Sequence, residues 1–485
     1  MSEQRDKSLS FGELISGKND PQTIYGINNA CISRLGHVLC ANNLLRRAGN
    51  TVYYFDMKKR GESSGEEEDL PPPDYVFYTG CARAEKDVDD MGTCMDICVG
   101  GQAIKGLFLM GCIKDVNDNF AGEPFDKYLR EQLGFDEDFP ITHVDELSGT
   151  EFGFISDNTY LIESGCSNRC GYCMGHYVDN REPHSADRAT IIADLQKAYD
   201  DGLRVVKISG ENTALFGVDK DGERHLHELI WDISAIGFTS VFIYNIAPQN
   251  IYPELVEALR DAPHIDGIKI AVETADEPIL ESVGRGGTAD VISDSVREIR
   301  SEKPWFYVGV NMVTGLPGET DETHERARKY LRDNTMVVDV SNRLHSHDSL
   351  PVSKLLNQVD TETAERRARD LYELNGELVG NYVAMLSELG INIPLKISHI
   401  NDAADDNGRF KQITLDSPFA FGVHSAVKYD SDLRVGDTVR FFFDDAVVRR
   451  YATTPDRPRP EFYTSGYIGE YIPDSDSNEC RVLSC

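Results

Sequence analysis

Short apolar runs alternate with amphipathic segments over most of the chain, from about residue 21 to residue 390. The apolar runs are typical of strands that are buried on both faces, whereas apolar positions that recur every three or four residues are typical of helices. Strands that alternate with helices predict a parallel sheet covered by helices on both faces. We therefore predict an α/β fold for this part of the chain.

The alternation forms two regions, which follow a polar and flexible N-terminus at residues 1–20. The first region, residues 21–148, is predicted to be a parallel α/β domain. Its strands are Thr23–Ile27, Thr51–Phe55, Tyr75–Tyr78 and Leu107–Met110, and its helices are Leu35–Ala48 and Asp87–Gln102. The second region, residues 149–390, is predicted to be a partial β/α barrel, in which functional residues lie at the carboxyl ends of the strands. Its strands are Thr159–Ile162, Val205–Ile208, Val241–Tyr244, Gly267–Val272, Phe306–Met312 and Val337–Val340, and Ala189–Tyr199 and Tyr252–Leu259 are among its helices.

From about Ile391 the pattern changes to short strands that are separated by polar turns. We predict a small β-barrel at residues 391–453. Its strands are Ile393–Ile397, Phe410–Thr414, Val439–Phe443 and Val447–Tyr451. The remaining residues, 454–485, are rich in Pro and Asp and are predicted to be a disordered tail. The alternative is that Cys480 and Cys485 form a mobile redox or sulfur-carrying pair.

The charge of the chain limits the classes of partner that it is expected to bind. The 485 residues, enough for about three domains, carry 82 acidic and 49 basic side chains, a net charge of -33. Such a surface repels phosphate backbones and favours a basic protein or a small molecule. Adaptation of the organism to salt would explain the same acidity. No apolar signal or membrane-spanning run is present, so we expect a cytoplasmic monomer without a membrane partner.

One loop carries the clearest chemistry. Cys166, Cys170 and Cys173 are spaced C-x3-C-x2-C directly after a predicted strand. Three thiolates this close are able to ligate three irons of a [4Fe–4S] cluster, which leaves the fourth iron open for a small chelating molecule. The alternatives are packed thiols or a zinc site with His176 as the fourth ligand.

Three further cysteines lie at comparable places in the first region. Cys31, Cys81 and Cys112 each follow a predicted strand, and the carboxyl ends of parallel strands share one edge of a sheet. We therefore predict a second Fe–S cluster with one open iron; the alternative is unrelated thiols. Cys40 and the pair Cys94 and Cys98 lie in predicted helices and are interpreted as packed thiols, although the pair could serve as a reserve ligand or handle sulfur. The list of cysteines with a predicted metal role is Cys31, Cys81, Cys112, Cys166, Cys170 and Cys173.

Polar loops follow other strands of the predicted barrel. Gly210 allows a ligand to approach the backbone, and Glu211 is placed to accept from an ammonium group. Glu273, at the end of a strand, is placed to bind ribose hydroxyls, and Arg285 follows it. The glycine-rich turn Thr314–Thr320 ends the next strand. Together these loops favour a cofactor pocket, whereas each alone is compatible with a role in folding.

The cysteine spacing, with aromatic Tyr172 before the last cysteine, resembles the radical S-adenosylmethionine (SAM) superfamily. That resemblance implies a [4Fe–4S] cluster that binds SAM and cleaves it reductively to a 5′-deoxyadenosyl radical. Over roughly residues 22–452 the chain resembles the radical SAM methylthiotransferases, which have an N-terminal domain with an auxiliary cluster, a radical SAM domain and a TRAM β-barrel. The matching segments are Glu211–Gly217, Gly315–Glu319, Ser346–Pro351 and Leu415–Gly422, the last being most similar to the branch that acts on a ribosomal protein.

This resemblance implies sulfur insertion at an unactivated carbon. The cluster at Cys31, Cys81 and Cys112 would donate sulfur, a catalytic role, and a second SAM would methylate it. It also implies an electron donor of the flavodoxin or ferredoxin type. A basic ribosomal protein is the expected substrate ahead of tRNA; the alternatives are a nucleoside or peptide natural product, or a non-catalytic Fe–S sensor. The chain departs from the family pattern at Glu273, where Gln is usual, and after Cys31.

Overall fold

The chain divides into two compact units, Met1–Ile155 and Ser156–Cys485, in the computed structural model. The residues it describes are 9–10, 13–14, 16, 18–28, 45–46, 48–56, 70–79, 91–95, 98–99, 103–110, 125–143, 152–155, 158–173, 182–286, 289–344, 350–405, 408–428, 431–450 and 462–471. Among the helices of these residues, none has both the length and the apolar character needed to span a bilayer.

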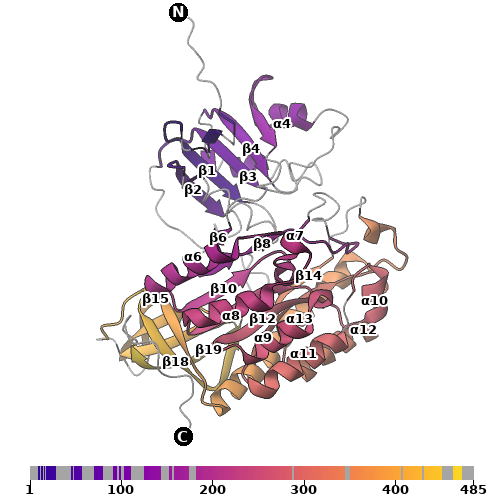
Figure 1. Ribbon diagram of the computed structural model, residues 1–485, viewed down its shortest axis with the longest axis vertical. Helices are drawn as coiled ribbons and strands as arrows, with labels where there is room; N and C mark the ends of the chain where they lie inside the picture. The colour runs from indigo at the N-terminus through magenta and orange to yellow at the C-terminus, as the bar shows by residue number, and fades with distance from the viewer. Residues whose placement is uncertain are drawn as a thin grey trace, which may run out of the picture. The chain divides into compact units, whose positions relative to one another are not determined.

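The first unit contains a parallel sheet of five strands in the order β2-β1-β3-β4-β5 (Figure 1). The strands are β1 (Thr23–Asn28), β2 (Thr51–Asp56), β3 (Tyr75–Thr79), β4 (Gly106–Met110) and β5 (Ile141–His143). Side chains alternate between the two faces: Tyr78 and Leu109 pack in one core cluster, and Phe77 and Phe108 pack in another. The predicted α/β fold of this region is confirmed.

The cysteines of the first unit are only partly within the described residues. Cys94 is buried in the core beside Met91, and Cys98 packs against the same core, as expected for packed thiols. Cys31, Cys40, Cys81 and Cys112 lie outside the described residues, as does Cys480 with Cys485. The second cluster therefore stays a prediction.

The second unit is built on a sheet of seven strands in the order β14-β13-β12-β11-β10-β7-β6. The strands are β6 (Gly153–Phe154), β7 (Thr159–Leu161), β10 (Val205–Ser209), β11 (Ser240–Ile246), β12 (Ile265–Glu273), β13 (Tyr307–Thr314) and β14 (Val337–Arg343). From β7 to β14 every neighbouring pair is parallel. This is the predicted partial β/α barrel, so the carboxyl ends of its strands share one edge.

Helices connect these strands and cover the outer face of the sheet (Figure 1). They are α6 (Arg188–Asp200), α8 (Leu226–Ile236), α9 (Pro253–Asp261), α10 (Glu277–Ser282), α11 (Ala289–Glu302) and α12 (Asp321–Asp333). On β12, Ile268 and Ile270 are buried, whereas Lys269 and Ala271, which alternate with them, are only partly buried. Because side chains alternate along a strand, one face of the sheet packs on the helices and the other lines the barrel interior.

A closed barrel of five strands, in the order β15-β16-β17-β19-β18, follows the sheet. Its strands are β15 (Asn392–Asp405), β16 (Gly408–Leu415), β17 (Gly422–Lys428), β18 (Thr438–Arg450) and β19 (Phe462–Tyr471). The two strands predicted at 439–443 and 447–451 form the single strand β18. The prediction of a tail after residue 453 is wrong for residues 462–471, because β19 pairs with both β17 and β18 and closes the barrel.

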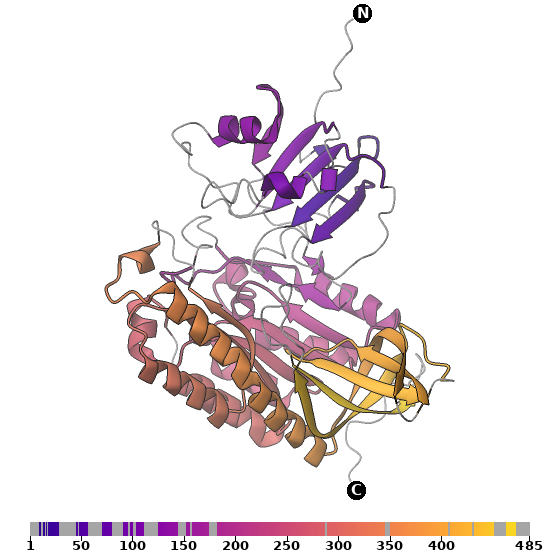
Figure 2. The same cartoon turned by 180° about the vertical axis from the view of Figure 1, so that it is seen from behind.

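One long helix, α13 (Thr361–Glu388), joins the sheet to this barrel and was not predicted. It is the long orange helix in Figure 2, where it runs beside the sheet toward the yellow barrel strands. Tyr382 and Leu386 of α13 pack in one core cluster with Phe242 and Tyr307 of the sheet and with Phe419 from the loop after β16. The sheet, α13 and the barrel therefore share a single hydrophobic core.

Candidate functional site

The cysteine loop begins at the carboxyl edge of the sheet, after β7. A short strand, β8 (Glu163–Ser164), pairs with β9 (His184–Ser185), and Gly165 then turns the chain with a φ of +87°. A Cβ atom on Gly165 would lie 2.1 Å from the Glu182 carbonyl oxygen. Only glycine therefore fits at the entrance to the loop.

The other end of the loop is held by backbone hydrogen bonds. Gly171 N donates to the Val283 carbonyl at 2.7 Å, and Val352 N donates to the Gly171 carbonyl at 3.1 Å. Cys173 N donates to the Cys170 carbonyl at 2.9 Å, which closes a turn. Segments from three parts of the sequence therefore fix the path of the three cysteines.

Two donors reach the sulfur atoms. Asn212 Nδ2 lies 3.5 Å from Cys166 Sγ, and Arg285 Nη1 lies 3.5 Å from Cys170 Sγ. Cys170 is only 4% exposed, whereas Cys166 and Cys173 are partly exposed. Burial raises the pKa of the Cys166 thiol to about 11, and hydrogen bonds from the Asn168 backbone and the Asn212 side chain act against this rise. A cation bound by the sulfur would favour the thiolate.

The three thiols do not form a site for a single metal ion. Within the described residues, no set of three or more His, Cys, Asp or Glu side chains converges closely enough to hold one ion. A zinc ion needs all its thiolates within about 2.3 Å of one point, whereas each thiolate of a cubane cluster binds a separate iron. His176, the fourth ligand expected for a zinc site, lies outside the described residues, so the assignment of the three cysteines to a cluster stays a prediction.

Gly210 and Asn212 lie next to this loop because of a buried carboxyl group. The side chain of Glu163 is fully buried, and its Oε2 accepts from Asn212 N at 3.0 Å. A Cβ atom on Gly210 would lie 2.3 Å from the same oxygen. Burial raises the pKa of Glu163 well above its usual value, and the nearby Glu211 raises it further. Sequence reasoning missed Glu163, although a carboxylate that ends the apolar run Tyr160–Ile162 was a signal for it.

A set of asparagines links three loops at the same edge. Asn250 Oδ1 accepts from Asn168 Nδ2 and from Asn212 Nδ2, both at 2.8 Å. Asn212 Oδ1 in turn accepts from Ala247 N at 3.2 Å. The cysteine loop, the loop after β10 and the loop after β11 are therefore held together. No sequence pattern signals this arrangement, since asparagines in loops are common.

Glu273, Arg285 and Tyr172 form a second polar group beside the cysteines. The register of β12 shifts between Ala271 and Glu273, and Glu273 has a left-handed φ of +66°. Its Oε1 lies 3.9 Å from Arg285 Nη2. Burial raises the pKa of Glu273, with Arg285 and the Tyr172 hydroxyl acting against it. The structure thus brings three of the predicted cofactor contacts together, on an edge where Gly210 and Glu211 also lie.

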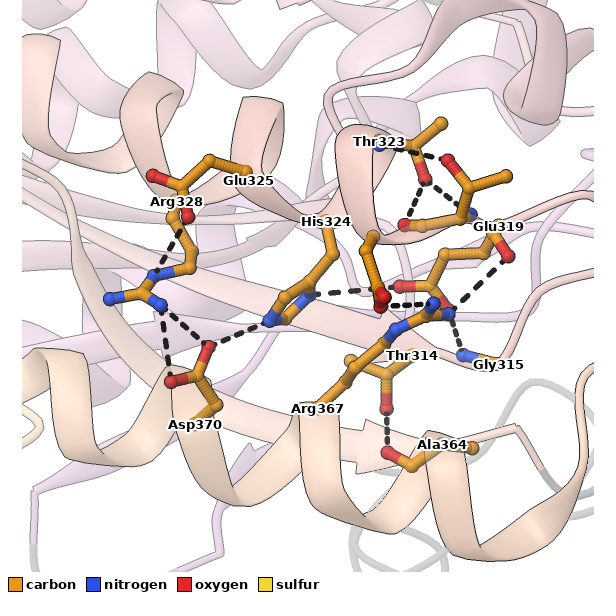
Figure 3. A network of polar contacts seen from close by, with 12 residues as sticks. Thr314, Gly315, Glu319, Thr323, His324, Glu325, Arg328, Ala364, Arg367 and Asp370 are labelled. Carbon is orange, nitrogen blue, oxygen red and sulfur yellow. Dashed lines mark hydrogen bonds and ion pairs between the residues drawn. The ribbon is translucent and has the colours of Figure 1, made fainter.

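The turn Thr314–Thr320 has a different surrounding from the one expected for a cofactor loop. Glu319 accepts from Gly315 N, and its Oε2 lies 3.3 Å from Arg367 Nη1 of α13 (Figure 3). His324 of α12 lies between Glu319 and Asp370, with its Nε2 2.7 Å from Asp370 Oδ2. Burial raises the pKa of Glu319, with Arg367 and the Gly315 amide acting against it. The turn therefore anchors α13.

The comparison with protein families agrees with this geometry. The Radical SAM superfamily model matches residues 160–331, which begin in β7 and include the cysteine loop. Two relatives are 28% identical over 219 residues. Ribosomal protein uS12 methylthiotransferase RimO of Heliobacterium modesticaldum matches 45% of this chain and 47% of its own length. The tRNA-2-methylthio-N(6)-dimethylallyladenosine synthase of Carboxydothermus hydrogenoformans matches 44% and 49%.

A third relative is similar to the chain over a longer stretch. The uS12 methylthiotransferase RimO of Acetivibrio thermocellus is 26% identical over 288 residues, 57% of this chain and 61% of its own length. The chain thus spans about half the length of the curated relatives it matches. Among solved structures, the cobalamin-bound radical SAM methyltransferase TsrM of Kitasatospora setae has a TM-score of 0.47 and 14% identity, covering 68% of this chain and 77% of that one.

The superfamily match coincides with the sheet that carries the cysteine loop, and the relatives are methylthiotransferases of two branches at modest identity. Residues 160–331 are thus similar to the Radical SAM superfamily, and the chain is similar, at modest identity and over about half of its length, to radical SAM methylthiotransferases.

Proposed function

We propose that the chain is a radical SAM enzyme that inserts sulfur, as a methylthio group, at an unactivated carbon of a basic protein. The observation that carries this proposal is the loop of Cys166, Cys170 and Cys173, fixed at the carboxyl edge of a parallel sheet with donors at two of its sulfurs. This loop lies within the residues that match the superfamily.

In this proposal Cys166, Cys170 and Cys173 hold a [4Fe–4S] cluster, and the buried Glu163 keeps the Gly210–Asn212 loop close to it. When bound, the cluster with SAM supplies a 5′-deoxyadenosyl radical that removes hydrogen from the substrate. The chain itself orients the cofactors and keeps the Cys170 thiolate away from water, since Cys170 is buried. Such exclusion protects a radical site from side reactions.

Five residues are proposed to contact SAM: Tyr172, Gly210, Glu211, Glu273 and Arg285. Gly210 has no side chain to block the approach of a ligand, and Glu211 is partly exposed beside it. Glu211 would accept from the SAM ammonium, and Glu273 would bind its ribose hydroxyls. Because Glu273 is buried and close to Arg285, a ribose contact would come from a carboxylate that is already oriented.

We further propose that Cys31, Cys81 and Cys112 hold an auxiliary [4Fe–4S] cluster that donates sulfur, within a domain at residues 21–148. The radical SAM domain would extend over residues 149–390, and the barrel that follows would be the TRAM-like part. A flavodoxin- or ferredoxin-like protein would supply the electron. These assignments rest on the resemblance and on strand ends that share an edge of the first sheet.

The substrate class is argued from charge. A net charge of -33 favours a basic protein over tRNA, because a nucleic-acid backbone is bound through cationic side chains. One relative is named for a ribosomal protein and another for a tRNA nucleoside. The identity to these relatives is low and their coverage is partial. A small molecule, such as a nucleoside or peptide, is therefore the second candidate for the substrate.

The test is anaerobic reconstitution with iron, sulfide and SAM, followed by incubation with a ribosomal-protein extract, with bulk tRNA and with small peptides. We expect 5′-deoxyadenosine to form and a protein fraction to gain the mass of a methylthio group. A gain on tRNA or on a peptide alone would replace the substrate assignment. Absence of both a cluster and SAM cleavage would overturn the enzyme proposal.

A further inference from the structure

Arg285 is a buried cation in contact with one of the cysteines. Its side chain is 6% exposed, and its Nη1 lies 3.5 Å from Cys170 Sγ. Its Nη2 donates to the Ala271 carbonyl at the end of β12 and lies 3.9 Å from Glu273 Oε1. Removing a guanidinium from water costs free energy that is recovered only when partners compensate its charge. The partners of Arg285 therefore indicate what its charge acts on.

The position of Arg285 is fixed by its backbone. Arg285 N donates to the Leu280 carbonyl at 2.9 Å, at the end of α10, and Gly284 before it has a left-handed φ of +67°. A guanidinium stays protonated in proteins, and Arg285 Nη2 is held by the Ala271 carbonyl. The group is therefore a permanent and immobile positive charge.

We infer that Arg285 raises the reduction potential of the cluster held by Cys166, Cys170 and Cys173, and so makes that cluster easier to reduce. The inference rests on the proposed function, since it requires the cluster. Reduction adds one negative charge, and a cation that donates to a ligating sulfur in a low-dielectric site stabilises the reduced form more than the oxidised form. Arg285 thereby acts on the cluster through Cys170, because it holds a positive charge next to that sulfur.

Glu273 opposes Arg285 in this arrangement. Its carboxylate lies 3.9 Å from the guanidinium and offsets part of the positive charge that the sulfur experiences. Removing the two charges in turn is therefore expected to move the potential in opposite directions, which a general loss of packing would not do.

The experiment is a redox titration of the [4Fe–4S] cluster with dithionite and mediators, followed by electron paramagnetic resonance. It uses the full-length chain with Cys31, Cys81 and Cys112 all replaced by Ala, so that only the cluster of the radical SAM domain remains. Arg285→Lys and Arg285→Gln are compared, because both keep a polar chain of similar length and only Lys keeps the charge. We expect the potential of Arg285→Gln to be lower than that of Arg285→Lys, and Glu273→Gln to shift it upward.

Arg260→Gln is the control, because Arg260 forms its ion pairs with Asp261 and Glu298 on the helical side of the sheet and should leave the potential unchanged. Iron and sulfide are counted in every variant. A loaded cluster whose potential is equal in Arg285→Lys and Arg285→Gln overturns the role of Arg285, and a Glu273→Gln variant without an upward shift overturns the opposing role of Glu273. A parent chain that binds no cluster overturns the proposed function as well, so the two failures are distinguishable.

Discussion

At the scale of single residues, the site depends on close approaches that leave no room for a side chain. Gly210 passes over the carboxyl group of Glu163 at a distance that excludes even a methyl group. The same carboxyl group accepts from Asn212 N, so one buried side chain sets both the path of the loop and the place of the amide that reaches Cys166. A small substitution at Gly210 should therefore alter the surroundings of the cysteines.

Gly210→Ala tests this dependence. The added Cβ would lie 2.3 Å from Glu163 Oε2, so the loop or the Glu163 carboxyl group has to shift. We expect a loss of about 1–3 kcal/mol in the free energy of unfolding, as for other overpacked sites, and about tenfold weaker SAM binding by calorimetry, because 1.4 kcal/mol is a factor of ten. The control is Gly92→Ala, where the nearest atom is 3.8 Å away. Equal behaviour of the two variants would contradict the role of the close approach.

The two sets of cysteines are separable by the products they affect. Cys170→Ala should abolish formation of 5′-deoxyadenosine, because Cys170 is a ligand of the proposed SAM-cleaving cluster. Cys81→Ala should leave SAM cleavage largely intact and stop sulfur transfer. Chromatography of the deoxyadenosine and mass spectrometry of the substrate measure both in each variant. Sulfur transfer that survives in Cys81→Ala would remove the sulfur-donating role from the N-terminal cysteines.

At the scale of secondary-structure elements, α13 is attached to the sheet by charge as well as by apolar packing. Arg367 is only 5% exposed and donates to Asp321 Oδ1 at 2.9 Å while facing Glu319 (Figure 3). Its neighbour Arg366 is 58% exposed and lies 3.6 Å from the same Asp321 oxygen. Adjacent residues of the same type thus differ in burial and in the contact that Arg367 makes with Glu319.

That difference predicts the effect of removing each charge. Arg367→Met leaves Glu319 buried without its cation, and we expect a loss of about 3 kcal/mol in the free energy of unfolding. Arg366→Met removes an exposed pair and should cost less than about 1 kcal/mol. Chemical denaturation at pH 7 measures both. Similar losses in the two variants would show that burial of the Glu319 pair has no energetic consequence.

The raised pKa of Glu319 gives a pH dependence with a defined sign. In the unfolded chain its carboxyl group ionises around its usual pKa of 4.5, whereas the folded state retains the proton to higher pH. The unfolded state therefore binds fewer protons in this range, and the contribution of Glu319 to stability falls as the pH rises through its folded pKa. We expect the stability of Glu319→Gln, measured relative to the native chain in urea titrations, to rise as the pH increases above 4.5. A relative loss over this range would contradict the burial effect.

The elements that sequence reasoning found and missed have physical explanations. Strands such as β10 and β12 were found because strands buried between two layers are almost wholly apolar. Helix α13 was missed because its buried face includes Arg367 and Asn375, which interrupt the apolar periodicity. The cysteine loop was found from spacing within a few residues. The partner of Glu319 lies 48 residues away, and no local pattern marks such a contact.

At the scale of the whole molecule, the sheet and the barrel of the second unit share a core, and this core depends on β19. Phe242 and Tyr307 of the sheet pack with Phe419 and Phe441 of the barrel region. Strand β19 lies between β17 and β18, and a Cβ atom on its Gly466 would lie 2.0 Å from the Phe442 carbonyl oxygen. Close pairing of this strand is therefore required for the barrel to close.

Two truncations measure how much the fold depends on that strand. A chain that ends at residue 453 lacks β19 and exposes the edges of β17 and β18, and we expect it to aggregate or to lose several degrees in Tm. A chain that ends at residue 471 keeps every strand of the barrel and should melt as the full chain does. Thermal unfolding and soluble yield distinguish the two. Equal melting would mean that the barrel is stable with four strands.

The place of β19 at the end of the barrel has a consequence during synthesis. A nascent chain exposes its sheet strands to solvent well before residues 462–471 leave the ribosome, so Phe242 and Tyr307 stay next to an incomplete barrel until the last strand is made. Exposed apolar surface in such an interval attracts chaperones and proteases. Translation that stalls before residue 462 should therefore yield a chain that is degraded before it can acquire iron.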